Sequence, residues 1–371
     1  MQEDTLRHTV IIPTKNHPER LGRCLASLLE AGAEPGYCEI LVMDNSDPAF
    51  RQPNAAAVAS FDTDVVRWIP MASVGLMAAR HEGARAAKGD LISFVDDDER
   101  VFPTWLSAVR SCFASPEVAL ATGPFRPSYE ASVPHWLESQ WVCGDRGRWL
   151  GYLTLLELEE SADWIDPVMV WGGNLTIRKS VFTEVRGSHP DYLPDPWTAY
   201  QGDGEVGLTV KVAAAGYRAR YSAAAGVWHS VPEERMTLEY LERRAWFVGL
   251  HISYTRYRRE NGLGPHEGVP LLGAPAAAPG LARRAARAVR RRVPALRGVA
   301  ADHVPTRGVN QRASVVAEVR ARLEQAELYG QQWHGEQVAG DMDLAAWVLR
   351  KDYMDVSMPP EPAGSRRDPC Q

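Results

Sequence analysis

Short apolar segments alternate with amphipathic segments along the first hundred residues of the chain. Two helices are expected, at residues 18–32, where leucines recur at helical spacing before a glycine, and at the alanine-rich residues 75–90. Strands are expected at four apolar runs that end in proline or polar residues: HTVIIP (8–13), CEILVMDNS (38–46), DVVRWIP (64–70) and LISFV (91–95). This alternation predicts an α/β fold with a Rossmann-like, mostly parallel sheet flanked by helices.

The remainder of the chain falls into segments of different composition. Residues 120–235 are irregular and rich in tryptophan and glycine, whereas residues 236–260 and 315–333 have helical patterns. Residues 262–309 are rich in proline, alanine and arginine, and the tail 359–371 has the composition of a disordered segment. We expect a first domain at 1–235, which holds the sheet, and a helical C-terminal region at 236–358.

Composition excludes some classes of protein. The chain has 371 residues, 45% of them hydrophobic, and its net charge of -6 gives no reason to expect a nucleic acid partner. Five scattered cysteines without a C-x-x-C pair suggest reduced thiols. The first residues contain no long apolar stretch, and no apolar run approaches about 20 residues, so we expect a cytoplasmic protein without a signal peptide or a membrane span.

Arginine greatly outnumbers lysine, and with the abundant alanine this indicates a GC-rich, bacterial genome. The run RRAARAVRRR (283–292) lies in the wider segment 281–297 and fits either a solvated segment or peripheral contact with an anionic surface. The sequence is compatible with a monomer or a homodimer.

An acidic cluster follows the last of the four apolar runs. Asp96, Asp97 and Asp98 come directly after the predicted strand 91–95, and Asp44 lies near the end of another. Ligands of such sheets bind at the carboxyl ends of the strands, so these residues are expected to share one site. Alternation along extended backbone turns Asp96 and Asp98 to one side, where their oxygens suit Mg²⁺ or Mn²⁺. A solvated acidic turn that caps the next helix is the alternative.

Five segments together resemble family-two inverting glycosyltransferases of the GT-A fold. They are VIIPTKNHPERLGRCLASL, ILVMDNS, GLMAARHEGARAAKGDLISFVDDD, WGGNLTIRKSVF and GDGEVGLTVKVAAAGY, and they span roughly residues 8–250 in the family's order. The resemblance implies a nucleotide-sugar donor, usually a UDP- or dTDP-sugar, and a divalent metal, Mn²⁺ or Mg²⁺.

The resemblance assigns the first segment to the base and ribose of the donor. The residues concerned are Pro13, Thr14 and Asn16, with Glu19 or Arg20 nearby. Polar residues that cap the following helix are the structural alternative.

Further donor contacts are implied at the later segments. Asp44 matches the aspartate that hydrogen-bonds the base, and Arg80 lies in a segment that lines the base or phosphates, although His81 replaces the family's asparagine. Asp96 would meet the sugar or ribose, with Asp97 among the donor-binding residues, and Asp98 would meet the metal.

The fourth segment matches the floor of the acceptor pocket. Gly172 and Gly173 would let the backbone approach a sugar closely, and Asn174 would hydrogen-bond it. Trp171 would stack on a sugar ring or, alternatively, pack in the core.

The last segment matches the family's general base. Counting back from Leu208 gives Glu205 as the base, with Asp203 as its rival. His229 lies where relatives place a histidine near the metal or diphosphate, and it would join Asp96 and Asp98 as a metal ligand or have a structural role.

The sequence thus predicts an inverting glycosyltransferase that moves a sugar to a hydroxyl or amine of a small metabolite, as in secondary metabolism, or of a glycan. A metal-dependent nucleotidyltransferase is one alternative, although the chain has no GxGxR signature at the first strand. A non-catalytic protein that binds sugar nucleotides is the other, and it would not need the intact carboxylates.

Overall fold

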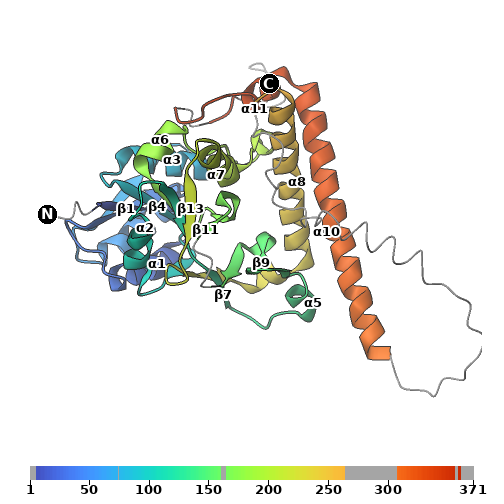
Figure 1. Cartoon of the computed structure of the whole chain (residues 1–371), viewed down its shortest axis with the longest axis horizontal. Coiled ribbons are helices and arrows are strands. Elements are labelled where there is room, and N and C mark those ends of the chain that lie inside the picture. Colours follow the sequence, from blue (N-terminus) through green and yellow to red (C-terminus); the bar gives the residue numbers. More distant parts are fainter. Residues whose placement is uncertain (1–5, 74, 160–163, 264–306, 356–357, 361–371) are drawn as a thin grey trace, which may run out of the picture.

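The computed structural model describes residues 6–73, 75–159, 164–263, 307–355 and 358–360. The arginine-rich run and most of the tail therefore lie outside the described residues. The predicted α/β fold is confirmed, with a sheet flanked by helices and a helical C-terminal region (Figure 1).

The first sheet has eight strands in the order β11-β13-β6-β12-β4-β1-β2-β3. The four predicted strands pair in parallel, namely β1 (His8–Thr14), β2 (Cys38–Asp44), β3 (Val66–Pro70) and β4 (Leu91–Val95). The other strands are β6 (Val118–Thr122), β11 (Trp164–Ile165), β12 (Asn174–Arg178) and β13 (Arg218–Tyr221). Strand β12 runs antiparallel to both of its neighbours, β4 and β6, so the sheet is mixed.

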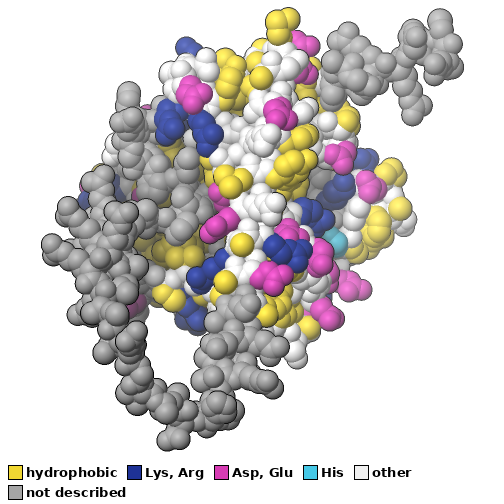
Figure 2. All heavy atoms as spheres, turned by 90° about the vertical axis from the view of Figure 1, so that its right-hand side faces the viewer, with side chains coloured by type: hydrophobic (Ala, Val, Ile, Leu, Met, Phe, Trp, Pro, Cys, Tyr) yellow, Lys and Arg dark blue, Asp and Glu magenta, His cyan; other side chains and the backbone are white. Residues whose placement is uncertain are grey.

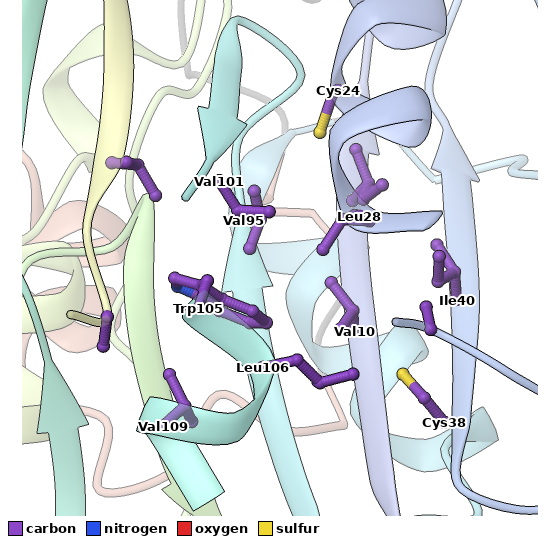
Figure 3. Packing of buried hydrophobic residues seen from close by; sticks show 14 of the residues in the cluster. Val10, Cys24, Leu28, Cys38, Ile40, Val95, Val101, Trp105, Leu106 and Val109 are labelled. Carbon is purple, nitrogen blue, oxygen red and sulfur yellow. The ribbon is translucent and has the colours of Figure 1, made fainter. Parts of the chain in front are cut away.

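Helices cover this sheet. They are α1 (Pro18–Glu30), α2 (Pro48–Ala59), α3 (Leu76–Ala86), α4 (Trp105–Cys112), α6 (Lys179–Glu184) and α7 (Gly204–Ala214). Side chains of α1, α4, β1, β2 and β4 pack in one core, in which Trp105 is completely buried (Figure 3). Each aliphatic side chain buried in this way contributes about 1.5–3 kcal/mol, which fixes the strands whose ends carry the acidic cluster.

A second sheet has six strands in the order β5-β14-β7-β10-β9-β8. They are β5 (Glu99–Val101), β7 (Phe125–Tyr129), β8 (Val142–Gly144), β9 (Gly147–Leu150), β10 (Leu155–Leu158) and β14 (Val227–Val231). Because β4 ends at Val95 and β5 begins at Glu99, the three aspartates 96–98 form the link between the two sheets.

The C-terminal helices pack against each other beside the sheets. Helices α8 (Leu238–Glu260) and α10 (Arg307–Gly340) run side by side, and α11 (Met342–Val348) follows (Figure 1). A Cβ atom on Gly249 of α8 would lie 2.2 Å from the carbonyl oxygen of Glu327, so the two long helices pack backbone to backbone.

The side of the molecule that carries these helices mixes hydrophobic side chains with acidic and basic ones (Figure 2). Leu328 and Tyr329 of α10 are 64% and 61% exposed. None of the described helices is long and apolar enough to cross a membrane.

Candidate active site

The acidic cluster joins the carboxyl end of β4 to that of β1. The Thr14 hydroxyl donates a hydrogen bond to Asp97 Oδ2 over 2.5 Å. Burial raises the pKa of Asp97 to about 7, although the Thr14 hydroxyl opposes the shift. Two of the predicted donor residues are thereby brought together at the sheet edge where ligands of such sheets bind.

Arg80 connects the acidic cluster to the predicted base. Its guanidinium lies 3.4 Å from Asp96 Oδ1 through Nη2 and 3.6 Å from Glu205 Oε2 through Nη1, and the residue is only 4% exposed. Burial alone would lower the pKa of Arg80, but the carboxylates of Asp96 and Glu205 outweigh it and raise the pKa. A permanently charged group therefore stands between the donor side and the candidate base.

Asp98 is paired with an arginine that the sequence analysis did not single out. Arg235, in the short 3-10 helix Glu233–Met236, places Nη2 2.7 Å from Asp98 Oδ2. The same guanidinium donates from Nη1 to His229 Nε2 over 2.9 Å, and that Nε2 is 3.9 Å from Asp98 Oδ2. Asp98 and His229 are thus brought together, as predicted, but with a guanidinium bound to both.

Glu205 and Asp203 have opposite environments although only Gly204 separates them. Gly204 adopts a φ of 53°, in the left-handed region that favours glycine, and the chain turns there. Glu205, in the first turn of α7, keeps 24% of its side chain exposed and faces Arg80. Asp203 is buried and accepts hydrogen bonds from His189 Nδ1 at 2.5 Å and Thr255 Oγ1 at 2.7 Å.

These bonds change the acidity of Asp203. Burial would raise its pKa, but His189 and Thr255 reverse the effect and lower the pKa to about 2. A carboxylate of that acidity, with both oxygens already bonded inside the protein, is poorly suited to take a proton from a substrate.

Asn16, in the loop after β1, is hydrogen-bonded within the protein. Asn16, at a φ of 64°, exchanges two hydrogen bonds with Asp47, and its backbone N–H donates to Ser46. Asn16 thus clamps the loop after β1 to the loop after β2. Pro13 is buried, and Glu19 is exposed on α1.

Asp44 is fully buried. Its carboxylate accepts hydrogen bonds from Ser46 N at 2.9 Å, Asn54 Nδ2 at 3.1 Å and Trp68 Nε1 at 2.9 Å. Contact with a nucleotide base stays a prediction.

The predicted acceptor segment has mainly internal contacts. Trp171 is 4% exposed and packs beside Phe125, with 5.9 Å between ring centroids, which agrees with the core-packing alternative. Asn174 is fully buried, and its amide group is hydrogen-bonded within the protein. The amide oxygen accepts from Trp105 Nε1 and the amide nitrogen donates to the carbonyl of Ala225, each at 2.8 Å.

Gly172 and Gly173 make room for side chains of the site, while their contact with a sugar stays a prediction. A Cβ atom on Gly172 would lie 2.5 Å from Arg80 Nη2, and one on Gly173 would lie 2.3 Å from Glu99 Oε1. Both glycines are therefore needed for the buried charges behind the acidic cluster.

A cavity of about 330 Å³ opens beside the aspartates. Its lining includes Asp97, Asp98, Arg20 of α1 and Trp228 of β14. Of the two helix residues suggested by the sequence, Glu19 and Arg20, it is Arg20 that lines this cavity.

The carboxylates fit a divalent cation in kind, because Mg²⁺ and Mn²⁺ prefer oxygen ligands. Among the described residues, no group of three or more His, Cys, Asp or Glu side chains is arranged to hold a metal. Of the predicted metal ligands Asp96, Asp98 and His229, the last two are instead bonded to Arg235.

The sequence analysis did not identify two further residues near the site, Glu99 and His189, as functional candidates. Glu99 is 1% exposed, and burial raises its pKa well above the usual range. His189 fixes Asp203 from a loop that carries no motif. Neither has a local sequence signal, because each acquires its role from a contact across the fold.

Comparisons with known proteins bear on the family and the fold of the chain. Residues 9–186 match the model of the family described as glycosyl transferase family 2. The match ends before Glu205 and His229, so the assignments of these two residues rest on geometry and on the resemblance of their segments.

Two curated proteins are similar to part of the chain. The succinoglycan biosynthesis protein ExoM of Rhizobium meliloti (strain 1021) is 26% identical over 141 residues, which are 38% of this chain and 45% of that protein. An uncharacterized protein, MT1568, of Mycobacterium tuberculosis (strain CDC 1551 / Oshkosh) is 32% identical over 118 residues, 32% of this chain and 36% of that protein. The chain thus matches less than half the length of either relative.

A solved structure is similar over nearly the whole fold. The mannosyltransferase PcManGT from Pyrobaculum calidifontis, in complex with GDP-Man and Mn²⁺, aligns with a TM-score of 0.54 at 18% identity. The alignment covers 90% of this chain and 88% of that one. The family model thus identifies residues 9–186 as a glycosyl transferase family 2 domain, and the chain shares the GT-A fold of the structurally similar mannosyltransferase.

Proposed function

We propose that the chain transfers a sugar from a UDP- or dTDP-sugar to a hydroxyl or amine of a small metabolite or glycan, with inversion at the anomeric carbon. The observation that carries the proposal is Arg80, which contacts Asp96 of the acidic cluster and Glu205 at 3.4 and 3.6 Å. Its guanidinium holds the donor side and the base side of the site in one arrangement.

Glu205 acts as the general base in this proposal. A sugar hydroxyl is a weak nucleophile near pH 7, so a carboxylate must take its proton as the oxygen attacks the anomeric carbon. The bond from that carbon to the phosphate oxygen breaks in the same step, and the nucleoside diphosphate leaves with the electron pair. Partial exposure of Glu205 supports this role, whereas the buried and doubly bonded Asp203 is better suited to support α7 and α8.

A divalent cation, Mn²⁺ or Mg²⁺, would be held by Asp96 and Asp98 with His229 beside them. When bound, it would neutralise charge on the departing diphosphate. Mn²⁺ in the structurally similar mannosyltransferase supports a metal, and GDP-Man in the same protein makes a GDP-sugar the donor that must be tested beside UDP- and dTDP-sugars.

The donor is tested by thermal shift with UDP-, dTDP- and GDP-sugars, each with and without Mn²⁺. A ligand that binds only the folded state raises the melting temperature. We expect one nucleotide class to give a shift that requires Mn²⁺, and the matching donor to release nucleoside diphosphate when incubated with the enzyme.

The stereochemistry is read from the anomeric coupling of the product by NMR. One displacement inverts the configuration once, so the anomer must differ from that of the donor. Retention would reject the single displacement, and the absence of any shift or release with all three nucleotide classes would reject the proposed donor chemistry.

A further inference from the structure

Arg235 occupies the place at Asp98 where a cation would bind. It contacts Asp98 Oδ2 at 2.7 Å and His229 Nε2 at 2.9 Å, and these residues supply two of the three predicted metal ligands. Since an arginine can only donate, the lone pair of His229 Nε2 is used by the guanidinium. Asp98 Oδ2 and His229 Nε2 are therefore already bonded to a resident cation.

A metal ion and the guanidinium cannot share these atoms. Two cations held a few ångströms apart repel each other strongly in a site shielded from solvent, and Asp98 is only 9% exposed at its side chain. A metal that coordinates Asp98 Oδ2 and His229 Nε2 must displace Arg235.

Arg235 has room and a chemical reason to move. It lies on a four-residue 3-10 helix, 25% of its side chain is exposed, and the cavity of about 330 Å³ opens next to Asp98. A diphosphate offers a guanidinium oxygens that match its planar fork of donors. An incoming nucleoside diphosphate would thus give Arg235 a new partner at the moment when Asp98 becomes available to the metal.

We propose that Arg235 and a divalent cation exclude each other at Asp98, and that the diphosphate of the donor draws Arg235 away. The exclusion stands on the contacts of Arg235 alone, while its release by a nucleoside diphosphate rests on the proposed function. Metal binding should therefore be weak in the free protein and strong in the presence of nucleotide.

The test measures Mn²⁺ affinity directly, from the electron paramagnetic resonance signal of free Mn²⁺ during titration. The wild type is compared with Arg235→Ala, Arg235→Lys and the control Arg243→Ala, an exposed arginine on α8. Each is titrated alone and with UDP, dTDP or GDP, and titrations without protein correct for Mn²⁺ held by the nucleotide itself.

We expect Arg235→Ala to bind Mn²⁺ without nucleotide at least tenfold more tightly than the wild type, within the usual range of coupling between sites. The nucleotide should raise Mn²⁺ affinity in the wild type and in Arg243→Ala, and much less in Arg235→Ala. Arg235→Lys should bind free Mn²⁺ less tightly than Arg235→Ala, because the lysine keeps a positive charge near Asp98.

Unchanged Mn²⁺ affinity of Arg235→Ala in the absence of nucleotide would overturn the proposal. If Arg235→Ala does not fold, Arg235→Lys decides in its place, and nucleotide coupling equal to that of the wild type would reject the role of Arg235. Failure of sugar transfer in the wild type would reject the proposed function while leaving the nucleotide-free Mn²⁺ comparison valid.

Discussion

Replacing Asp203 by asparagine should destabilise the protein more than it slows the chemistry. Two donors, His189 Nδ1 and Thr255 Oγ1, point at this carboxylate, at 2.5 and 2.7 Å. An asparagine side chain offers one acceptor oxygen and turns N–H groups toward the other donor. One buried donor therefore loses its partner, and the negative charge is lost as well.

The magnitude follows from two considerations that agree. A hydrogen bond to a charged group contributes about 1.5–3 kcal/mol. The pKa of Asp203 is lowered from 3.8 to about 2, which at 1.36 kcal/mol per unit corresponds to roughly 2 kcal/mol of stabilisation. We expect Asp203→Asn to lower the free energy of unfolding by about 2–4 kcal/mol, a large fraction of the 5–15 kcal/mol typical of a folded protein.

The assay is denaturant unfolding, with the exposed Asp64→Asn as control. The control should change stability by less than about 0.5 kcal/mol. The folded pKa of Asp203 is depressed, so its stabilising effect is present above the unfolded pKa near 3.8 and is lost as pH falls toward 2. The stability difference between wild type and Asp203→Asn should therefore be constant from pH 5 to 7 and shrink below pH 4. Wild-type stability of Asp203→Asn at pH 7 would refute this reasoning.

Two glycine substitutions test the packing of the site and of the long helices. Gly172→Ala should lower the transfer rate by displacing Arg80, whose Nη2 would lie 2.5 Å from the new Cβ. The control Gly151→Ala, whose new Cβ would have no atom within 4 Å, should leave the rate unchanged. Equal rates in the two variants would contradict the role of Gly172. Gly249→Ala should destabilise the chain by about 1–3 kcal/mol because α8 and α10 must separate, whereas Gly335→Ala, with its nearest neighbour at 3.7 Å, should be neutral or stabilising. Equal melting temperatures of these two variants would reject the close packing.

The parallel half of the first sheet could be predicted because its signals are local. Strands β1 to β4 are continuous apolar runs that end in proline or polar residues, and each appears within two residues of its expected position. Helix α2 was missed because Pro48 and Pro53 interrupt the helical signal. The second sheet pairs strands from distant segments, such as β5 with β14, and short strands of that kind have no local signature.

The candidate site likewise contains residues with a local sequence signal and residues without one. Asp96, Asp98 and Glu205 could be proposed from motifs, because each follows a strand or begins a helix at a recognisable spacing. Arg235 has no such signal, since its role depends on a contact with Asp98 across 137 positions of the chain. The glycines at 172 and 173 were recognised, but their neighbours became visible only in the fold.

The central claim, that Glu205 takes the acceptor's proton, is tested most directly by the rate of sugar transfer in Glu205→Gln at saturating donor. Glutamine keeps the shape of the side chain and a contact near Arg80 but cannot accept a proton from the acceptor. We predict that the rate constant falls roughly 10² to 10⁴-fold, as for a lost general base, while the donor binds with wild-type affinity. A rate within a few-fold of the wild type, or a larger loss per folded molecule in Asp203→Asn, would contradict the account.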